Sequence, residues 1–340
     1  FFDGNGYKLP DEVEDQLEEY VRQSADNELP RPTGDGIGKI EHNSNLAHFY
    51  AHFVRHTIDT SLEGMTIVYD GANGAASSVG PEILAGLGAK VININVNPDG
   101  LNINHHCGST HIEGLQVAVQ QHNADLGIAN DGDADRCLLV DEKGQVLDGD
   151  QIMLLCALKL KEEGKLKDDT VVGTVMSNIG FHKAAQELGM KTFATAVGDR
   201  YVLEYMREHN LSVGGEQSGH VIFLDYNTTG DGMLTAVQVA ALMKEKNQPL
   251  SELAGIMTKY PQVLINVRVA TKTGWEDNDI IKAAIVTAEG ELGVEGRVLV
   301  RASGTEPLIR VMAEGPNQEA LQALCQEIAD IIGREQGLAE

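Results

Sequence analysis

Short apolar segments alternate with amphipathic ones along most of the chain, and this order predicts strands and helices in turn. The first run has predicted strands at 65–69, 90–96 and 126–129 and helices at 46–58, 77–88 and 112–122. The second run has predicted strands at 170–175, 192–196 and near Val213, and helices at 151–161, 180–188, 199–209, 231–246 and 251–257. Strands that alternate with helices form a parallel or mixed sheet covered by helices. The pattern therefore predicts two successive α/β domains, over residues 43–146 and 147–258.

The two ends of the chain follow different patterns. Residues 10–24 are acidic and place Val13, Leu17 and Tyr20 on one face, which predicts an amphipathic helix. After Tyr260 the regular alternation stops. The predicted strands there are 263–269, 297–301 and 308–314, and the predicted helices are 278–289 and 317–332. This order is typical of a smaller C-terminal α+β domain, over residues 259–340, whereas residues 1–42 are predicted to be a separate N-terminal stretch.

Composition and charge narrow the classes of partner. The 340 residues include 51 Asp and Glu against 26 Lys and Arg, a formal net charge of −25. Nucleic acids and anionic membranes attract basic proteins, so we expect the chain to bind neither, although a few local cations can still hold a small anion. The four cysteines lie far apart in the sequence and have no CxxC spacing. No apolar run is long enough to span a membrane, and no signal peptide is visible. These features predict a cytoplasmic protein with reduced cysteines.

Three carboxylates stand at alternate positions directly after the predicted strand 126–129. The run is Asp131-Gly132-Asp133-Ala134-Asp135-Arg136, here called the metal loop. Its small intervening residues let three oxygens converge on one hard cation, Mg²⁺ or Ca²⁺. An EF-hand would need glycine at Arg136 and helices on both sides, and a haloacid dehalogenase motif would need Thr at Asp135. A solvated acidic turn is the remaining alternative, and we favour a metal because three carboxylates without a cation repel one another.

Two glycine-containing loops carry candidate groups for a sugar and a phosphate. In the sugar loop (residues 214–220, GGEQSGH), Glu216 and Ser218 suit sugar hydroxyls, which both donate and accept hydrogen bonds, and a tight turn is an equal alternative. The phosphate loop (residues 301–310, RASGTEPLIR) supplies two guanidinium groups, two hydroxyls and the N–H groups around a glycine. These are the elements of a phosphate cradle, and a Ser-Gly turn held by a surface arginine is the alternative.

Two further features carry candidate chemistry. The run Gly198-Asp199-Arg200-Tyr201 opens a predicted helix, where N–H groups and Arg200 can hold an anion. Capping of that helix by Asp199 is the simpler interpretation from sequence alone. His220, which ends the sugar loop, is a candidate for proton transfer, and a structural role is favoured for it.

The order of these loops resembles that of the α-D-phosphohexomutase family. The matching runs are NDGDADR (130–136), LDGDQIM (147–153), VGDRYVLE (197–204), GGEQSGH (214–220), NTTGDGM (227–233) and RASGTEPLIRVMAEG (301–315). The likeness covers essentially all 340 residues, and the last run is very specific. Members of the family have four domains around a deep cleft. They move a phosphate between C6 and C1 of a hexose through a phosphoserine and a bisphosphorylated intermediate.

The resemblance implies a role for each loop. Asp131, Asp133 and Asp135 would bind the Mg²⁺ that also contacts the phosphoserine. Glu216 and Ser218 would hold sugar hydroxyls, and Asp199 and Arg200 are further candidates for substrate binding. The residues implied to hold the phosphate that does not react are Arg301, Ser303, Gly304, Thr305 and Arg310. The implied substrate is a hexosamine phosphate; glucose and mannose phosphates stay open, because the sugar loop does not by itself select the substituent at C2.

Two departures from the family pattern matter. Ala134 stands where the metal loop usually has glycine, and alanine does not take positive φ freely, so we expect a slightly strained loop that still binds metal. No Ser-His-Asn-Pro run occurs in the sequence. We therefore expect the nucleophilic serine upstream of Phe1, residues 1–42 to be the remnant of the first domain with its linker, and little turnover by this chain alone. A non-catalytic phosphosugar-binding protein is the alternative.

Overall fold

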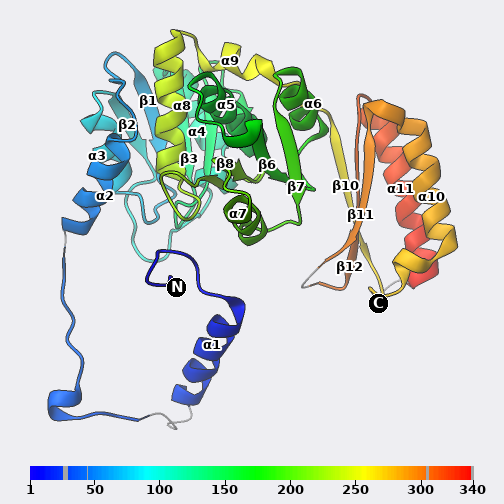
Figure 1. The fold of residues 1–340 in the computed structure, drawn as a ribbon, viewed down its shortest axis with the longest axis horizontal. Coiled ribbons are helices and arrows are strands. Elements are labelled where there is room, and N and C mark those ends of the chain that lie inside the picture. The colour runs from blue at the N-terminus through cyan, green and yellow to red at the C-terminus, as the bar shows by residue number, and fades with distance from the viewer. Residues whose placement is uncertain (26–29, 44, 304–305, 338–340) are drawn as a thin grey trace. The chain divides into compact units, whose positions relative to one another are not determined.

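The computed structural model describes residues 1–25, 30–43, 45–303 and 306–337. Its contacts divide the chain into two compact units, one of residues 1–175 with 193–254 and one of residues 176–192 with 255–340. The first unit holds two mixed sheets and the second holds one antiparallel sheet with helices (Figure 1). The fold is therefore α/β with a C-terminal α+β part, as the hydrophobic pattern predicts.

The first sheet has the strand order β2-β1-β3-β4-β5. Its strands are β1 (Thr66–Asp70), β2 (Lys90–Ile94), β3 (Leu126–Asn130), β4 (Cys137–Asp141) and β5 (Val146–Leu147). The helices nearest to it in sequence are α2 (Asn45–Arg55), α3 (Val79–Gly86) and α4 (Glu113–His122). β1 pairs in parallel with β2 and β3, whereas β4 runs antiparallel to β3. Every residue of β3 is buried, so the metal loop that follows it starts from a fixed strand end.

The second sheet has the order β7-β6-β8-β9. Its strands are β6 (Thr170–Thr174), β7 (Lys191–Thr195), β8 (Val213–Gly215) and β9 (Val221–Phe223). The helices of this region are α5 (Gly149–Glu162), α7 (Asp199–Glu208), α8 (Gly232–Lys246) and α9 (Leu250–Leu253). α8 is buried from Gly232 to Met243, because it packs against α2 and α5 as well as against β3 and β4 of the first sheet. A helix that is apolar on every side needs such surroundings.

The second unit is built on an antiparallel sheet of order β10-β12-β11. Its strands are β10 (Gln262–Arg268), β11 (Arg297–Ala302) and β12 (Leu308–Glu314), and its helices are α6 (Ile179–Glu187), α10 (Asp279–Leu292) and α11 (Gln318–Gln336). α10 and α11 lie side by side along the sheet (Figure 1). Their apolar faces and the sheet enclose a core that includes Trp275, the single tryptophan of the sequence.

A buried polar cluster fastens α6 to the C-terminal sheet within this unit. Glu314 on β12 has a side chain with 0% exposure, and its Oε2 accepts hydrogen bonds from Arg297 Nε at 2.7 Å and from the Ile179 N–H at 3.0 Å. Asn178 caps α6 by accepting from the Gly180 N–H and donates through Nδ2 to the Tyr260 carbonyl. The first turn of α6 therefore meets a carboxylate, which a helix N-terminus favours.

His182 gives the second unit a predictable response to acid. Burial, together with the positive charge of Arg297, lowers its pKa to about 4. The unfolded chain takes up a proton near pH 6.5, so stability is expected to fall as the pH decreases from about 6.5 to 4. A His182→Gln variant should lose less stability over this range, measured by Trp275 fluorescence in urea. Equal slopes for the two proteins would contradict the assignment.

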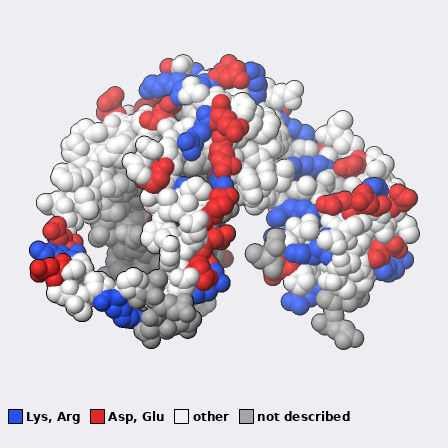
Figure 2. All heavy atoms as spheres, turned by 60° about the horizontal axis from the view of Figure 1, so that its bottom comes forward, with Lys and Arg blue, Asp and Glu red and all other residues white. Residues whose placement is uncertain are grey.

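The face of the molecule drawn in Figure 2 carries charged side chains of both signs. Figure 2 shows acidic and basic side chains interspersed on the face drawn, not separated into two halves. α1 (Asp11–Ala25) has six acidic residues in its sequence and leaves Tyr20 and Val21 exposed. Among the residues that the structure describes, no helix combines the length and the apolar composition needed to cross a membrane.

Candidate functional site

The metal loop connects the ends of two paired strands. β3 ends at Asn130 and β4 begins at Cys137, so the loop is a turn between antiparallel strands, unlike the loop between two helices of an EF-hand. One carboxylate oxygen from each of Asp131, Asp133 and Asp135 lies within 4.8 Å of the others. Oxygen donors converging from alternate residues match the ligands that Mg²⁺ and Ca²⁺ prefer. The three residues thus form a candidate site for a hard cation.

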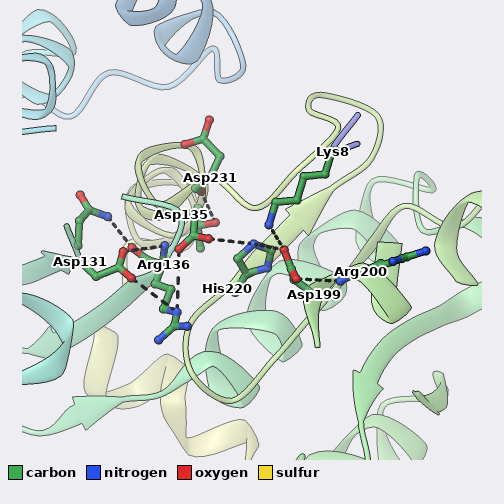
Figure 3. Close-up of polar contacts among 10 residues, drawn as sticks. Lys8, Asp131, Asp135, Arg136, Asp199, Arg200, His220 and Asp231 are labelled. Carbon is green, nitrogen blue, oxygen red and sulfur yellow. Dashed lines mark hydrogen bonds and ion pairs between the residues drawn. The ribbon is translucent and has the colours of Figure 1, made fainter. Parts of the chain in front are cut away.

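The electrostatics of the loop favour a bound cation. Burial raises the pKa of Asp131, and the negative charges of Asp135 and Asp133 raise it further. Burial and Asp133 raise the pKa of Asp135 in the same way. Arg136 compensates in part, with its Nε 3.6 Å from Asp131 and 3.9 Å from Asp135 (Figure 3). Three converging carboxylates against one guanidinium leave negative charge that a divalent ion would neutralise.

The backbone of the metal loop shows the strain that its sequence predicts. Ala134 has φ +64°, in the left-handed region that glycine takes freely and alanine takes at a cost. Neighbouring segments hold the loop on both sides. The Ala75 N–H donates to the Gly132 carbonyl at 2.8 Å, and the Gly232 N–H donates to the Ala134 carbonyl at 2.9 Å. The loop is therefore fixed from outside.

The sugar loop lies beside the metal loop. It joins β8 to β9, and the Cys137 N–H at the start of β4 donates to the Gly219 carbonyl at 2.9 Å. A Cβ at Gly219 would lie 2.5 Å from the Cys137 carbonyl oxygen, so this close approach requires glycine. Glu216 is half-buried and accepts a hydrogen bond from the Gly198 N–H at 3.0 Å, whereas Ser218 is exposed.

His220 and Asp199 complete the site in the first unit. The buried His220 places Nε2 3.5 Å from Asp135 and 3.6 Å from Asp199 (Figure 3). Burial lowers the pKa of His220, although Asp199 opposes this shift. Arg200 instead donates through Nε to Glu204 at 2.8 Å, along its own helix. The metal loop, the sugar loop and Asp199 therefore converge, while the Arg200 side chain extends away from His220 (Figure 3).

Lys8 belongs to this site and was missed by sequence reasoning. Its ammonium pairs with Asp199 and lies beside His220 (Figure 3). The Tyr7 ring is stacked under the Arg207 guanidinium, 3.8 Å from the ring centroid, and this contact holds the N-terminal segment on α7. A cavity of about 330 Å³ lies between this segment and α7, lined by Lys8, Asp199 and His220 among others. The signal in the sequence is a lone lysine between an aromatic residue and an apolar one, which is too common to identify a site.

The phosphate loop lies in the second unit. Arg301 on β11 and Arg310 on β12 are directly opposite in the ladder. Burial lowers the pKa of Arg301, and the like charge of Arg310 lowers it further. Ser303 is buried, and its Oγ accepts from the Glu306 N–H at 3.3 Å. Gly304 and Thr305, two further predicted phosphate ligands, lie outside the residues that the structure describes.

Paired like charges require a partner of opposite sign. Arg310 meets Glu306 at 3.2 Å through Nη2, while its buried Nε has no hydrogen-bond partner among the described residues. Like charges at directly opposite positions of a strand pair are destabilising. The arrangement is therefore one that an oxyanion would stabilise.

Models of one protein family match most of the chain. They describe domains II, III and the C-terminal domain of phosphoglucomutase/phosphomannomutase, over residues 47–144, 148–260 and 264–331. Among curated relatives, phosphoglucosamine mutase of Symbiobacterium thermophilum is 55% identical and that of Bacillus subtilis is 49% identical. These matches cover 98% and 99% of this chain and 74% and 75% of the relatives.

Solved structures share the fold at lower identity. A phosphoglucomutase/phosphomannomutase family protein from Burkholderia thailandensis aligns with a TM-score of 0.75 at 21% identity, over 96% of this chain and 71% of its own. N-acetylphosphoglucosamine mutase of Aspergillus fumigatus, solved with GlcNAc-6P and magnesium, aligns with a TM-score of 0.67 at 23% identity, over 83% and 68%. Family models, curated relatives and fold agree, and the chain belongs to the phosphoglucomutase/phosphomannomutase family of α-D-phosphohexomutases.

Proposed function

We propose that the chain supplies the metal, sugar and phosphate loops of a phosphoglucosamine mutase, an isomerase that interconverts glucosamine 6-phosphate and glucosamine 1-phosphate by intramolecular phosphoryl transfer. Curated relatives at about half identity carry this name. The observation that carries the proposal is the convergence of three carboxylates, Lys8 and His220 beside the sugar loop. The four cysteines are free, which suits the proposed cytoplasmic location.

Phosphoryl transfer depends mainly on positioning and on neutralising the charge of the moving group. Asp131, Asp133 and Asp135 would hold Mg²⁺, which when bound neutralises charge on that group. The Lys8 ammonium, which pairs with Asp199, adds a second positive charge close enough to oppose the rise in the pKa of Asp135.

The remaining groups hold the sugar and its second phosphate. One oxygen of Glu216 accepts a hydrogen bond from the Gly198 N–H, and this bond orients the carboxylate. Its other lone pairs can then accept hydrogen bonds from sugar hydroxyls. Ser218 both donates and accepts, so the sugar loop suits an intermediate that turns round between the two transfers. Arg301, Arg310 and Ser303 are proposed to grip the phosphate that is not transferred. In this proposal the domains over 43–146, 147–258 and 259–340 contribute one loop each.

Turnover of matched substrates tests the proposal. The product of the complete reading frame that encodes this chain should be assayed with the 6-phosphates of glucosamine, glucose and mannose, in Mg²⁺ and a hexose bisphosphate activator. The expected result is the highest kcat/KM for glucosamine 6-phosphate. A higher value for glucose or mannose would reassign the substrate. Binding without turnover, in a product that contains the serine loop, would indicate a phosphosugar-binding protein.

The Arg301→Ala variant should bind glucosamine 6-phosphate more weakly by about 1.5–3 kcal/mol, or roughly 10- to 150-fold, as expected for charge-assisted hydrogen bonds. Arg301 is half-buried, and among the residues that the structure describes its side chain makes no hydrogen bond or ion pair with a group of opposite charge, so the change removes little structural support. Calorimetric titration of the 340-residue chain measures the effect. Arg334→Ala, on the exposed side of α11, is the matched control. An unchanged affinity for Arg301→Ala would show that the loop is structural.

A further inference from the structure

The N-terminus of α8 lies directly against the strained residue of the metal loop. The Gly232 N–H, at the first position of α8, donates to the Ala134 carbonyl at 2.9 Å. A Cβ at Gly232 would lie 2.2 Å from the Arg136 carbonyl oxygen and 2.3 Å from Nδ2 of Asn130. The helix end and the loop are thus in backbone contact, and a displacement of one displaces the other.

A buried carboxylate fixes this helix end. Asp231 caps α8 by accepting the Leu234 N–H at Oδ1, 2.9 Å away. The same oxygen accepts the Tyr50 hydroxyl at 2.7 Å, and Oδ2 accepts Nδ2 of Asn227 at 3.0 Å. Tyr50 comes from α2, far from α8 in the sequence. The hydroxyl of Tyr50 therefore ties α2 to the residue that sets the position of Gly232.

The conformation of Ala134 makes this tie relevant to the metal. A left-handed alanine is energetically unfavourable, and it persists only where its surroundings hold it. Ala134 stands between Asp133 and Asp135. If the hydrogen bond from the Gly232 N–H to the Ala134 carbonyl weakens, Ala134 can relax toward negative φ. This relaxation moves the two carboxylates relative to each other.

We infer that Tyr50 is a positioning residue for the cation site, acting through Asp231 and the N-terminus of α8 on Ala134. The inference rests on the proposed function in one respect, the binding of Mg²⁺ by the metal loop. It adds that the affinity for Mg²⁺ is set by a hydroxyl on α2, which is not itself a ligand. It also explains how this loop tolerates alanine where the family pattern has glycine.

The experiment first removes the hydrogen bond between Tyr50 and Asp231, and then replaces the strained alanine that this hydrogen bond is inferred to support. Tyr50→Phe in the 340-residue chain should raise the Kd for Mg²⁺ about tenfold, the lower end of the range for groups that orient metal ligands. Adding Ala134→Gly should restore most of the affinity, because glycine takes the left-handed conformation without external support. Calorimetry with Mg²⁺ measures the affinity, and Mn²⁺ electron paramagnetic resonance reports the geometry of the site.

Thr57→Val is the matched control. Thr57 lies just beyond the end of α2, and its hydroxyl accepts a hydrogen bond from Gln238 of α8 at 2.9 Å, away from the helix N-terminus. We expect a similar loss of stability and a Kd within twofold of the parent. Should Tyr50→Phe fail to fold, Asn227→Ala, which removes the bond to the other oxygen of Asp231, takes its place.

The outcomes separate the two proposals. If the parent chain does not bind Mg²⁺, the metal site of the proposed function fails. If the parent binds but Tyr50→Phe binds equally well, the positioning role of Tyr50 is wrong. Failure of Ala134→Gly to rescue the weakened variant also overturns the inference, because the effect then does not pass through the strained residue.

Discussion

Asp133→Asn is expected to weaken Mg²⁺ binding by about 100-fold, since the charge of the ligand set tunes cation affinity over orders of magnitude. Asp133 is exposed, and among the described residues it makes no hydrogen bond or ion pair. The substitution therefore removes one negative charge and leaves the packing intact. Calorimetric titration of the 340-residue chain with Mg²⁺ measures the change.

The free energy of unfolding provides a second readout, because Asp133→Asn should affect it differently without Mg²⁺ and with Mg²⁺. In a chelator, Asp133→Asn should be at least as stable as the parent, because the charge of Asp133 raises the pKa values of Asp131 and Asp135 by repulsion. In excess Mg²⁺ the parent should gain stability through binding, and the variant should not. Asp59→Asn, an exposed acid outside the cluster, is the control. Equal gains for all three proteins would show that the loop is a solvated acidic turn.

Arg297→Met is expected to destabilise the second unit by about 3–5 kcal/mol at neutral pH, the usual result of leaving one member of a buried ion pair alone. Glu314 has 0% side-chain exposure, whereas Arg297 keeps 26%. The carboxylate therefore cannot reach water when its partner is removed. Urea unfolding followed by Trp275, which lies in the core of this unit, measures the change.

The pH dependence of the stability loss and a double variant test whether the loss comes from the buried, unpaired Glu314 carboxylate. Burial raises the pKa of Glu314, and Arg297 opposes this shift. Without Arg297 the carboxyl accepts a proton more readily in the fold, so the loss of stability should shrink as the pH decreases from 7 toward 5. The smaller depression of the His182 pKa without Arg297 acts in the same direction. A double variant with Glu314→Gln should recover part of the loss, and equal losses at every pH would contradict this account.

The local elements could be predicted because their signals are local. The strands β1, β3, β6 and β12 are short apolar runs next to turn residues, and α8 and α11 have clear helical patterns. β5 was missed because it has only two residues. Such short strands exist because a neighbouring strand pairs with them, and a single-sequence pattern does not contain the neighbour.

The candidate site also has one part that consecutive residues predict and one part that depends on contacts between distant residues. The spacing of Asp131, Asp133 and Asp135 predicted a cation loop, and Ala134 predicted its strain, because both are properties of consecutive residues. The roles of Glu216, Ser218 and Arg301 stay predictions of the resemblance. Lys8 could not be predicted, because its proximity to Asp199 joins segments about 190 residues apart.

The sequence by itself determined the fold class, the family and the order of the metal, sugar and phosphate loops, since these depend on periodicity and on contiguous motifs. Tertiary structure alone decided that Lys8 pairs with Asp199, that His220 meets the metal loop and that the Glu314 carboxylate fastens α6 to the C-terminal sheet. It also decided that Tyr50 reaches the helix end that holds Ala134. These contacts join residues far apart in the chain, and their energies depend on burial, which exists only once the chain has folded.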